Sequence, residues 1–577
     1  MADALSTPTS TVNQQQRSSR TSTVVSSLAA ASVLTLASCV AGLCIGVGWR
    51  VDQFAFVGVF GLGAFLAVQV SLRSFWSCVL LAIITGYLAY LIANPWINWT
   101  MEGLARDEAS VKVFALVHGV HLLHGGMYSL FAAFWWVSRK WLHLGIYAAP
   151  ALWLILEAVY PAMFPMRQAC LIASVTPLIQ IGAIFGVVGV TLQVFAIASL
   201  APLAYLSWGG ANRTEDRTAK YFMLAILIFT VINYGWGAYR ASEIQKQADN
   251  FSGSYLNVGL LQGDTEYAGS NFSFAERSRQ LVDCDLVLWP ECSFGKYQQD
   301  LIDFSDDTQV AKKSTGIGFQ FRPLPDPVCH LLGGGYSWTT QKQILDQPTE
   351  QANPGFPQRP KIDEKFVSAF LLDPNEQLVG RHDKIELMAG GEYTPFADVF
   401  PWLDDWLAAE TSDDDEVKLS RGEQASPIGD VNGMSVGALL CCEDMYPRLS
   451  RQMTRQGADL LVCLTNGMSF NSDIALRQHF NIGCFRAVEN NRYFVRCGSH
   501  GISGLISPNG SPQQLLPCFE ELDVTLEIPH QQRATTWFCH VGDTLTPASY
   551  FTVILLSIFT CFQSTRRRSE RSASDGN

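Results

Sequence analysis

Long apolar stretches dominate this 577-residue sequence and restrict its fold more than any other feature. Crossing about 30 Å of hydrocarbon takes roughly 20 apolar residues. Seven such stretches come before one large polar segment and one comes after it, which predicts a multi-pass helical membrane protein with eight spans. We place the spans near residues 24–47, 53–72, 75–94, 112–137, 143–163, 182–208, 220–238 and 545–563.

Basic residues indicate the orientation of these spans. The first span follows Arg17 and Arg20, and its apolar run is longer than the roughly 7–15 residues of a cleavable signal core, so we interpret it as an uncleaved helix. With a cytoplasmic N-terminus, the short loops follow the positive-inside rule, and the segment between the seventh and eighth spans is exported. The cytoplasmic side then holds Arg73, Arg139, Lys140, Arg213, Arg217, Lys220, Arg566, Arg567 and Arg568, against Arg50, Arg106, Lys112 and Arg167 on the other side.

The expected domains follow from these spans. We expect a polar cytoplasmic tail over 1–23, a seven-helix membrane domain over 24–238 and an exported domain over 239–544. The eighth helix covers 545–563 and a basic cytoplasmic tail covers 564–577. The net charge of −12 arises in the exported segment and gives no support for nucleic-acid binding. The 15 cysteines show no zinc-type spacing, so no metal site is predicted from them.

Polar residues inside the predicted spans allow more than one interpretation. His118, His121 and His124 lie three residues apart, on roughly one face of the fourth span. They are a candidate metal site or proton relay, but polar side chains turned into the bundle are the favoured interpretation. Glu157, in ALWLILEAVYP, needs a partner because burying a carboxylate is costly. Whether it serves the exported domain or a contact between helices stays open.

The exported segment reads as an α/β domain. Short β-rich runs such as YLNVGLLQ, MSVGALLCCED and ADLLVCLTN alternate with helical candidates such as FAERSRQLVD and LRQHFNIGCFRAVENN. Continuous apolar runs of this kind are typical of strands buried on both faces, and their alternation with helices predicts sheets covered by helices. Residues 339–365 are expected to form a surface loop. Residues 396–410 are expected to be either a flap on the bilayer or an ordinary packing helix.

Three reactive residues follow predicted strands. Glu291 ends LVLWPE, Lys384 follows LVGRHD, and Cys441 ends the strand in VGALLCCE. Together they meet the needs of acyl transfer through a thioester, because a thiol with a pKa near 8.5 requires a base and a nearby cation. Glu291 is predicted to be the base, and Lys384 to stabilise the thiolate and the oxyanion. Glu392, in GGEYTP, is a second carboxylate that orients the lysine or assists proton transfer.

These motifs resemble a known family. WPE, the lysine with GEY eight residues later, and CxE resemble the Glu-Lys-Cys signature of the nitrilase, or carbon-nitrogen hydrolase, superfamily. With eight spans, ALWLILEAVYP and FRAVENNRYFVRCGSHGISGLISPNG, the chain resembles the apolipoprotein N-acyltransferases of bacteria over nearly its whole length.

The resemblance implies an α-β-β-α nitrilase sandwich and a two-step reaction. Cys441 would take an acyl chain from a membrane phospholipid as a thioester and pass it to the α-amino group of a lipoprotein's N-terminal diacylglyceryl-cysteine. Glu392 and Glu443 would support the catalytic set, and no cofactor or metal is required. The protein would lie in the bacterial inner membrane, with its catalytic domain exported and both termini cytoplasmic. A tethered nitrilase-type amidase or lipid hydrolase is the alternative, and a catalytically impaired lipid- or lipoprotein-binding scaffold is a third.

The resemblance also bears on the doubled cysteine and on several departures. The family pattern is Cys-Tyr-Glu, so Cys441 aligns with the nucleophile, Cys442 with the tyrosine and Glu443 with the acid. Alternation along a strand would send the two thiols in opposite directions, which also favours Cys441. The departures concern the expected pocket lining and flap, and they are Ser469 in place of an aromatic residue, Ala389 and Gly390 in place of bulky ones, and Val367-Ser368 in place of Asn-Ser.

Overall fold

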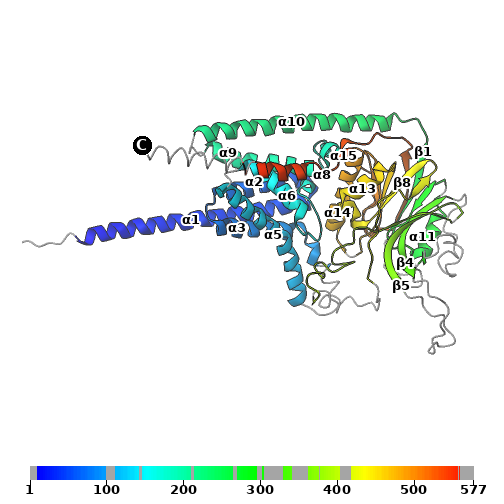
Figure 1. The fold of residues 1–577 in the computed structure, drawn as a ribbon, viewed down its shortest axis with the longest axis horizontal. Coiled ribbons are helices and arrows are strands. Elements are labelled where there is room, and N and C mark those ends of the chain that lie inside the picture. Colours follow the sequence, from blue (N-terminus) through cyan, green and yellow to red (C-terminus); the bar gives the residue numbers. More distant parts are fainter. Residues whose placement is uncertain are drawn as a thin grey trace, which may run out of the picture.

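The protein is described by a computed structural model that covers residues 9–98, 100, 111–141, 146–208, 213–263, 270–281, 283–294, 302–303, 329–340, 362–375, 377–402, 418–468, 470–555 and 558. It has a helical region and a region of two β-sheets, which lie side by side (Figure 1).

The helical region is built from the first half of the chain. Helix α1 begins at Thr9, well before residue 24, so part of the expected polar tail is helical. Three short 3₁₀ segments cover Asp52–Phe54, Ile146–Ala148 and Gln168–Ile172. The helices are α1 (Thr9–Arg50), α2 (Ala55–Ser71), α3 (Phe75–Ala93), α5 (Val111–Trp141), α6 (Ala149–Val159), α7 (Thr176–Ile179), α8 (Gly182–Ala198), α9 (Leu200–Trp208) and α10 (Arg213–Asp249).

Five helical segments in the described part of the chain are long and apolar enough to cross a membrane. The fifth and eighth predicted spans coincide with shorter apolar helices, Ile146–Val159 and Leu545–Leu555. The fourth predicted span lies in α5, which is long but carries three histidines and is not among the five. Several spans are therefore supported by length and composition, and the count of eight stays a prediction. The five segments are Ala29–Arg50, Asp52–Ser71, Phe75–Ala93, Gly182–Ser207 and Arg217–Asp249.

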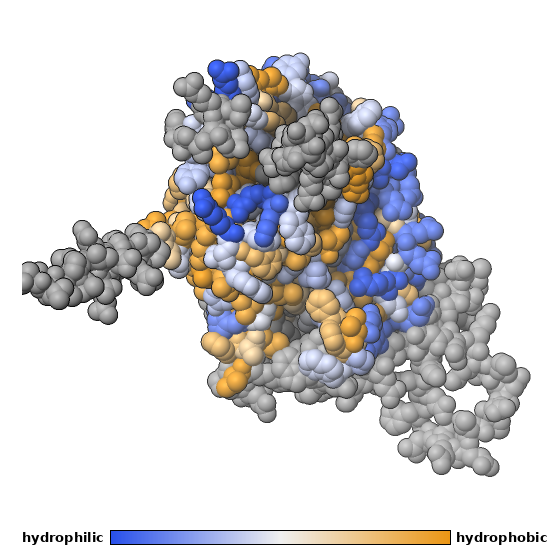
Figure 2. Space-filling view, turned by 60° about the vertical axis from the view of Figure 1, so that its left-hand side comes forward, coloured by the Kyte–Doolittle hydropathy of each residue, from blue (hydrophilic) through white to orange (hydrophobic). Residues whose placement is uncertain are grey.

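Apolar side chains cover the outside of the helical region. On α1, Val33, Leu36 and Val40 are exposed, and on α10 exposed apolar residues run from Tyr221 to Tyr239. Figure 2 shows this end of the molecule, where apolar residues, in orange, spread over the face and hydrophilic residues, in blue, gather along one side. An apolar surface of this extent is expected where lipid tails replace water.

The second half of the chain forms two sheets. Among the described residues the first sheet has seven strands, in the order β13-β1-β2-β4-β5-β6 with β3 paired to β4, and the second has six, in the order β12-β11-β10-β9-β8-β7. The inner strands β1, β2 and β4 run parallel, as do β8, β9 and β10. The strands are β1 (Tyr255–Gln262), β2 (Leu286–Leu288), β3 (Ile302–Asp303), β4 (His330–Thr340), β5 (Ile362–Leu372), β6 (Leu378–Asp383), β7 (Gly429–Val431), β8 (Met434–Leu440), β9 (Leu460–Asn466), β10 (Tyr493–Ser499), β11 (Gly504–Ile506), β12 (Pro512–Gln513) and β13 (Leu522–Pro529).

The two sheets face each other across one apolar core. Val258 of β1 and Val367 of β5 belong to the same buried cluster as Ala438 of β8 and Val462 of β9. The outer face of the first sheet packs against α11 (Ser270–Ser278). The outer face of the second packs against α13 (Pro447–Arg455) and α14 (Asp473–Asn490). The alternation of strands and helices predicted for this segment is confirmed.

Two predicted segments require correction. Thr339 and Thr340 belong to β4, and residues 362–365 belong to β5, so the ends of the expected loop are paired strands, and its interior, residues 341–361, lies outside the described residues. Residues 396–399 and Pro401 lie in turns and Trp402 is helical, while residues 403–410 of the expected flap lie outside the described residues. Residues 339–340 and 362–365 form paired strands and not a loop because β4 and β5 satisfy each other's backbone hydrogen-bonding groups along their length.

Helix α14 joins the two regions. Trp96 donates from Nε1 to the Gln478 carboxamide at 3.2 Å, and Gln478 donates in turn to the carbonyl of Ala93 at 2.9 Å. At the other end of α14, Glu489 accepts a hydrogen bond of 2.6 Å from the Val187 amide of α8. The Val187 amide is available to Glu489 because Gly186 departs from the helical conformation, with a φ of 69°, and so interrupts the hydrogen bonds within α8.

Candidate active site

Glu291 lies in a turn just beyond β2, close against the neighbouring strand. Because β2 ends at Leu288, the residue follows the strand after a short turn and does not end it. A Cβ atom added at Gly334 of β4 would lie 2.7 Å from the Glu291 Cα atom. The glycines of HLLGGGY, residues 330–336, therefore allow the turn to lie directly on β4.

Lys384 follows β6 at once and is entirely buried. Its ammonium donates to Glu291 Oε1 at 2.9 Å and to Glu392 Oε1 at 2.6 Å. Glu392 is held in turn by the Met388 amide, which donates to its Oε2 at 2.8 Å. An ammonium has three donors, so these two contacts leave one N–H for another acceptor.

Cys441 follows β8 directly and has an unusual backbone. The strand ends at Leu440, and Cys441–Met445 form a 3₁₀ turn. The φ of Cys441 is 47°, in the left-handed region that costs a non-glycine residue about 1–3 kcal/mol and that concentrates at functional sites. Its thiol lies close enough to the Glu291 carboxylate for the two groups to influence each other's pKa. The structure thus brings together Cys441, Glu291, Lys384 and Glu392, which are widely separated in sequence.

The charges of this cluster influence one another. Burial raises the pKa of Glu291, against the opposing effect of Lys384. Burial also raises the pKa of the Cys441 thiol well above its usual value, and the Glu291 carboxylate adds to that effect. Burial alone would lower the pKa of Lys384, but Glu291, the two cysteines and Glu392 together outweigh burial, and the pKa rises. The thiol therefore holds its proton at rest, beside a carboxylate that can accept it.

Glu443 joins the strand that carries Lys384 to the strand that carries Cys441. Its Oε1 accepts from the amide of Ile385 at 2.7 Å, and its Oε2 accepts from the amide of Leu440 at 2.8 Å. The same Oε2 is 2.8 Å from Nε2 of His382. Burial alone would raise the pKa of Glu443, but His382 and the backbone donors lower it. Its carboxylate holds the two reactive residues in register and does not reach the thiol.

Asp444 forms a second buried polar contact that the sequence interpretation missed. Its carboxylate accepts from Arg496 at 2.6 Å and lies 3.0 Å from His479 Nε2, while its carbonyl accepts from Arg486. The cysteine turn is thereby tied to α14 and β10. The only sequence signal was a pair of arginines in otherwise apolar runs, since buried arginines require partners.

The two adjacent thiols point to different partners. Cys442 Sγ lies 3.2 Å from the Glu386 carbonyl, whereas the Cys441 thiol lies near the Glu291 carboxylate. The prediction that strand alternation separates them is wrong in its reasoning, because neither cysteine is in the strand, and the 3₁₀ turn separates them instead. A third thiol, Cys292, lies partly buried beside Glu291 with its sulfur 3.8 Å from the Tyr336 hydroxyl. Burial raises its pKa to about 12, so it is a neutral packing group.

The intramembrane candidates lie apart from this cluster. Within the described residues no group of His, Cys, Asp or Glu is arranged to hold a metal ion. His118 is 2.7 Å from the Tyr87 hydroxyl and His124 is 2.9 Å from the Val120 carbonyl, as expected for polar groups turned into the bundle.

Glu157 accepts from Trp153, from the Gln168 amide at 2.7 Å and from Thr191 at 3.2 Å. These partners belong to the helical region, which resolves the open question in favour of a contact between helices. Ser469 lies outside the described residues.

Comparisons with known proteins agree on one family. The sequence model of the family described as carbon-nitrogen hydrolase matches residues 273–532, which include all five predicted site residues. The chain is 28% identical to an apolipoprotein N-acyltransferase of Geobacter metallireducens, over 78% of this chain and 80% of that protein. It is 24% identical to an apolipoprotein N-acyltransferase of Bdellovibrio bacteriovorus, over 81% of this chain and 82% of that one.

Among solved structures, the chain is similar to an amidase from Nesterenkonia sp., with 17% identity and a TM-score of 0.30, over 48% of this chain and 91% of that one. It is also similar to a nitrilase-superfamily protein of Saccharomyces cerevisiae, with 16% identity and a TM-score of 0.31, over 48% of this chain and 91% of that one. The family match and the two sheets, and not these two likenesses, identify the fold. Residues 273–532 of the chain therefore match the carbon-nitrogen hydrolase family, and the chain is similar, over most of its length, to the apolipoprotein N-acyltransferases.

Proposed function

We propose that this protein is an apolipoprotein N-acyltransferase. It transfers an acyl chain from a membrane phospholipid, through a thioester on Cys441, to the α-amino group of a lipoprotein's N-terminal S-diacylglyceryl-cysteine. One observation carries the proposal, namely the buried contact of Lys384 with Glu291 and Glu392 beside a strained cysteine. The names of the relatives supply the substrate class.

The first half-reaction forms the thioester. Glu291 takes the thiol proton as Cys441 Sγ attacks the ester carbonyl, and the remaining N–H of Lys384 stabilises the oxyanion, a contribution of about 3 kcal/mol. The ester bond breaks, Glu291 returns the proton to the leaving lysophospholipid oxygen, and the acyl group stays on sulfur. In the second half-reaction the amine attacks the thioester, Glu291 accepts a proton from the amine, and the thiol is restored as the amide forms.

An apolar cluster beside Glu392 supports a lipid acyl donor. It joins residues of α5 and of the segment after α3 to Met388, in the loop that carries Glu392. Exposing a 16-carbon chain to water costs on the order of 10 kcal/mol, at about 0.8 kcal/mol per methylene, so the reacting carbonyl has to be reached from an apolar environment. The cluster consists of Trp96, Ile97, Val117, Val120, Phe470 and Ala475, with Val113, Leu116, Met163, Phe164, Met388 and Ile474 packed against it.

The segment after Glu392 supports a site that faces the bilayer. Phe396, Val399, Phe400 and Trp402 are all exposed, and Trp402 is 62% exposed. Four exposed apolar residues within one short segment of turns are unusual on a surface that faces water. The segment lies on the membrane surface as the flap that covers the acyl chain.

The proposed topology has eight spans around a catalytic domain of residues 239–544. Seven spans lie within residues 24–238, the eighth covers 545–563, and the tails 1–23 and 564–577 are cytoplasmic. The catalytic domain is an α-β-β-α sandwich on the periplasmic side of the bacterial inner membrane. The distribution of arginine and lysine supports this orientation.

Incubation of the purified full chain with phospholipid vesicles and a diacylated lipopeptide tests the proposal. The expected products are an N-acylated peptide and one lysophospholipid for each acyl group transferred, as measured by mass spectrometry. Free fatty acid without acylated peptide would replace the proposal by lipid hydrolysis. The absence of both products from the wild-type protein would support the impaired scaffold.

A further inference from the structure

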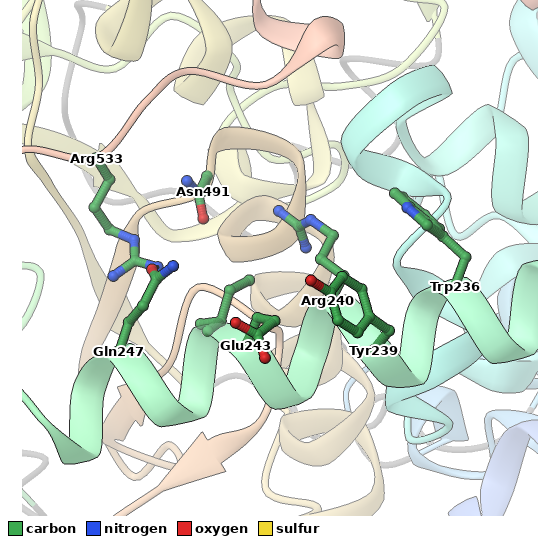
Figure 3. A pocket seen from close by; sticks show the side chains of 8 residues that line it. Trp236, Tyr239, Arg240, Glu243, Gln247, Asn491 and Arg533 are labelled. Carbon is green, nitrogen blue, oxygen red and sulfur yellow. The ribbon is translucent and has the colours of Figure 1, made fainter.

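A cavity lies between α10 and the part of the chain that follows β13. It has a volume of about 350 Å³ and shares no residue with the candidate active site. Helix α10 packs on α7, α8 and α9, whereas α5, which lies next to the catalytic loops, packs on α3 and α6. Figure 3 shows the side chains that line the cavity, which are Trp236, Tyr239, Arg240, Glu243, Ile244, Gln247, Asn491 and Arg533.

The cavity sits at the level where α10 leaves the apolar environment. Exposed apolar side chains continue along α10 as far as Tyr239, which is 66% exposed, and the next residue in the chain is Arg240. The following residues up to Asp249 are mostly polar. Aromatic residues followed by charged ones mark the interface between bilayer and water, so the cavity opens at the depth of the lipid headgroups.

Two arginines face this cavity from two different parts of the chain. Arg240 donates to the Gln180 carboxamide, and Arg533 donates to Gln531 at 3.0 Å and to Gln247 at 3.3 Å. Among the described residues neither arginine forms an ion pair with a carboxylate. Figure 3 shows both guanidinium groups and Asn491 around the space above α10. A pair of largely buried cations with only neutral partners favours the binding of an anion.

The acidic residue of the lining does not cancel this charge. Glu243 is paired with Lys246 at 2.8 Å, so its charge is already matched by a cation outside the lining. Two polar atoms near the cavity also lack partners among the described residues, the donor Nε of Arg533 and the acceptor Oδ1 of Asn491. A ligand that satisfied both would offer an acceptor oxygen and a hydroxyl donor. A phosphate ester that carries a hydroxyl group has both.

We propose that this cavity binds the phosphate ester of an anionic, hydroxyl-bearing headgroup, such as that of phosphatidylglycerol, between Arg240 and Arg533. Its volume suits a headgroup of this size. Basic pockets beside membrane helices are known to bind the headgroups of anionic lipids.

The two arginines lie on the two chain segments that connect the helical region to the sheets. Helix α10, which carries Arg240, leads into β1, and Arg533 lies between β13 and α15 (Trp537–Val541), from which the chain continues into the helix Leu545–Leu555. Strands β1 and β13 are paired along their whole length. A phosphate held by both arginines fastens both connections at the bilayer surface and so sets the height of the catalytic domain above the membrane.

Titration of the purified full chain with phosphatidylglycerol or phosphatidylcholine in detergent tests this site. We expect phosphatidylglycerol to bind more tightly and Arg240→Gln and Arg533→Gln each to weaken its binding about tenfold, since a charge-assisted hydrogen bond is lost. Arg50→Gln removes an exposed arginine at the end of α1, outside the cavity, and should leave binding unchanged. Glu243→Gln should strengthen binding, a gain that misfolding cannot produce.

A second arm of the experiment identifies the source of the phosphate. If glycerol phosphate competes with the lipid, the site recognises the phosphate ester itself and also takes soluble esters. If it does not compete, the site requires the lipid, and in both cases the proposal stands. Equal binding of the two lipids, or equal loss of binding in Arg50→Gln, would overturn it. The proposal does not depend on the acyl transfer, because Cys441→Ser should bind phosphatidylglycerol like the wild type.

Discussion

Replacement of Glu443 by glutamine should damage both stability and turnover, although the side chain does not reach the reacting sulfur. Its two oxygens accept from Ile385, the residue after Lys384, and from Leu440, the residue before Cys441. An amide in the same place directs a donor at one of these N–H groups in either orientation. One buried N–H is then left without an acceptor, and His382 loses a charged partner.

The cost follows from these contacts. Losing a charge-assisted hydrogen bond and leaving a buried donor unpaired costs about 3 kcal/mol. For a domain of about 300 residues that corresponds to a fall of roughly 5 °C in the melting temperature. A shift of about 1 Å between Lys384 and Cys441 lowers turnover by about 100-fold. Because lipid binding does not involve Glu443, KM for the phospholipid should change little while kcat falls.

Thermal unfolding and acyl transfer by the full chain measure these effects. The matched control is Glu386→Gln, since Glu386 is a carboxylate of the same loop that pairs with Arg421 at 3.2 Å and with Arg448 near the surface. Exposed ion pairs contribute little, so this control should remain within about 1 kcal/mol of the wild type. If Glu443→Gln melts and turns over like Glu386→Gln, the positioning role of Glu443 is wrong.

Three further predictions concern charge, acidity and packing. Lys384→Met leaves two buried carboxylates without their cation and should lower kcat by about 100–1000-fold, and Lys384→Arg should not restore it because the planar guanidinium does not fit the enclosed space. The pKa of Glu443 is lower in the folded protein than its value of about 4.3 in the unfolded chain, so Glu443 stabilises the fold at pH values above about 4.3. The melting temperature should therefore fall as the pH drops below about 4, and this fall should be less steep in Glu443→Gln. Gly186→Ala should reduce the melting temperature and the yield of folded protein, because Gly186 has a φ of 69° and the added Cβ would lie 2.4 Å from the Phe538 ring. The control Gly119→Ala should reduce neither, because no atom apart from its chain neighbours and the backbone of its own helix lies within 4 Å of the added Cβ.

The sequence was sufficient for the strands and for the cluster of reactive residues. Continuous apolar runs predicted the parallel strands because strands buried on both faces leave that pattern. Glu291, Lys384 and Cys441 were predicted to meet because each follows such a strand, and the structure places them in contact.

Features that depend on tertiary contacts could not be predicted from the pattern of residues in the sequence. The left-handed backbone of Cys441 has no signature in a non-glycine residue, so strand alternation was wrongly extended through it. His382 and Arg496 acquire their roles only when Glu443 and Asp444 are buried beside them. The partner of Glu157 was left open because its hydrogen bonds join residues from three separate helical segments.

The mass of the full chain after incubation with phospholipid, in the absence of an acceptor peptide, tests directly whether Cys441 carries the acyl group. We predict an adduct of one acyl group on the wild-type protein, released by hydroxylamine, absent from Cys441→Ser and retained by Cys442→Ser. An adduct that persists in Cys441→Ser but disappears in Cys442→Ser would assign the thioester to the other sulfur and refute the role of Cys441.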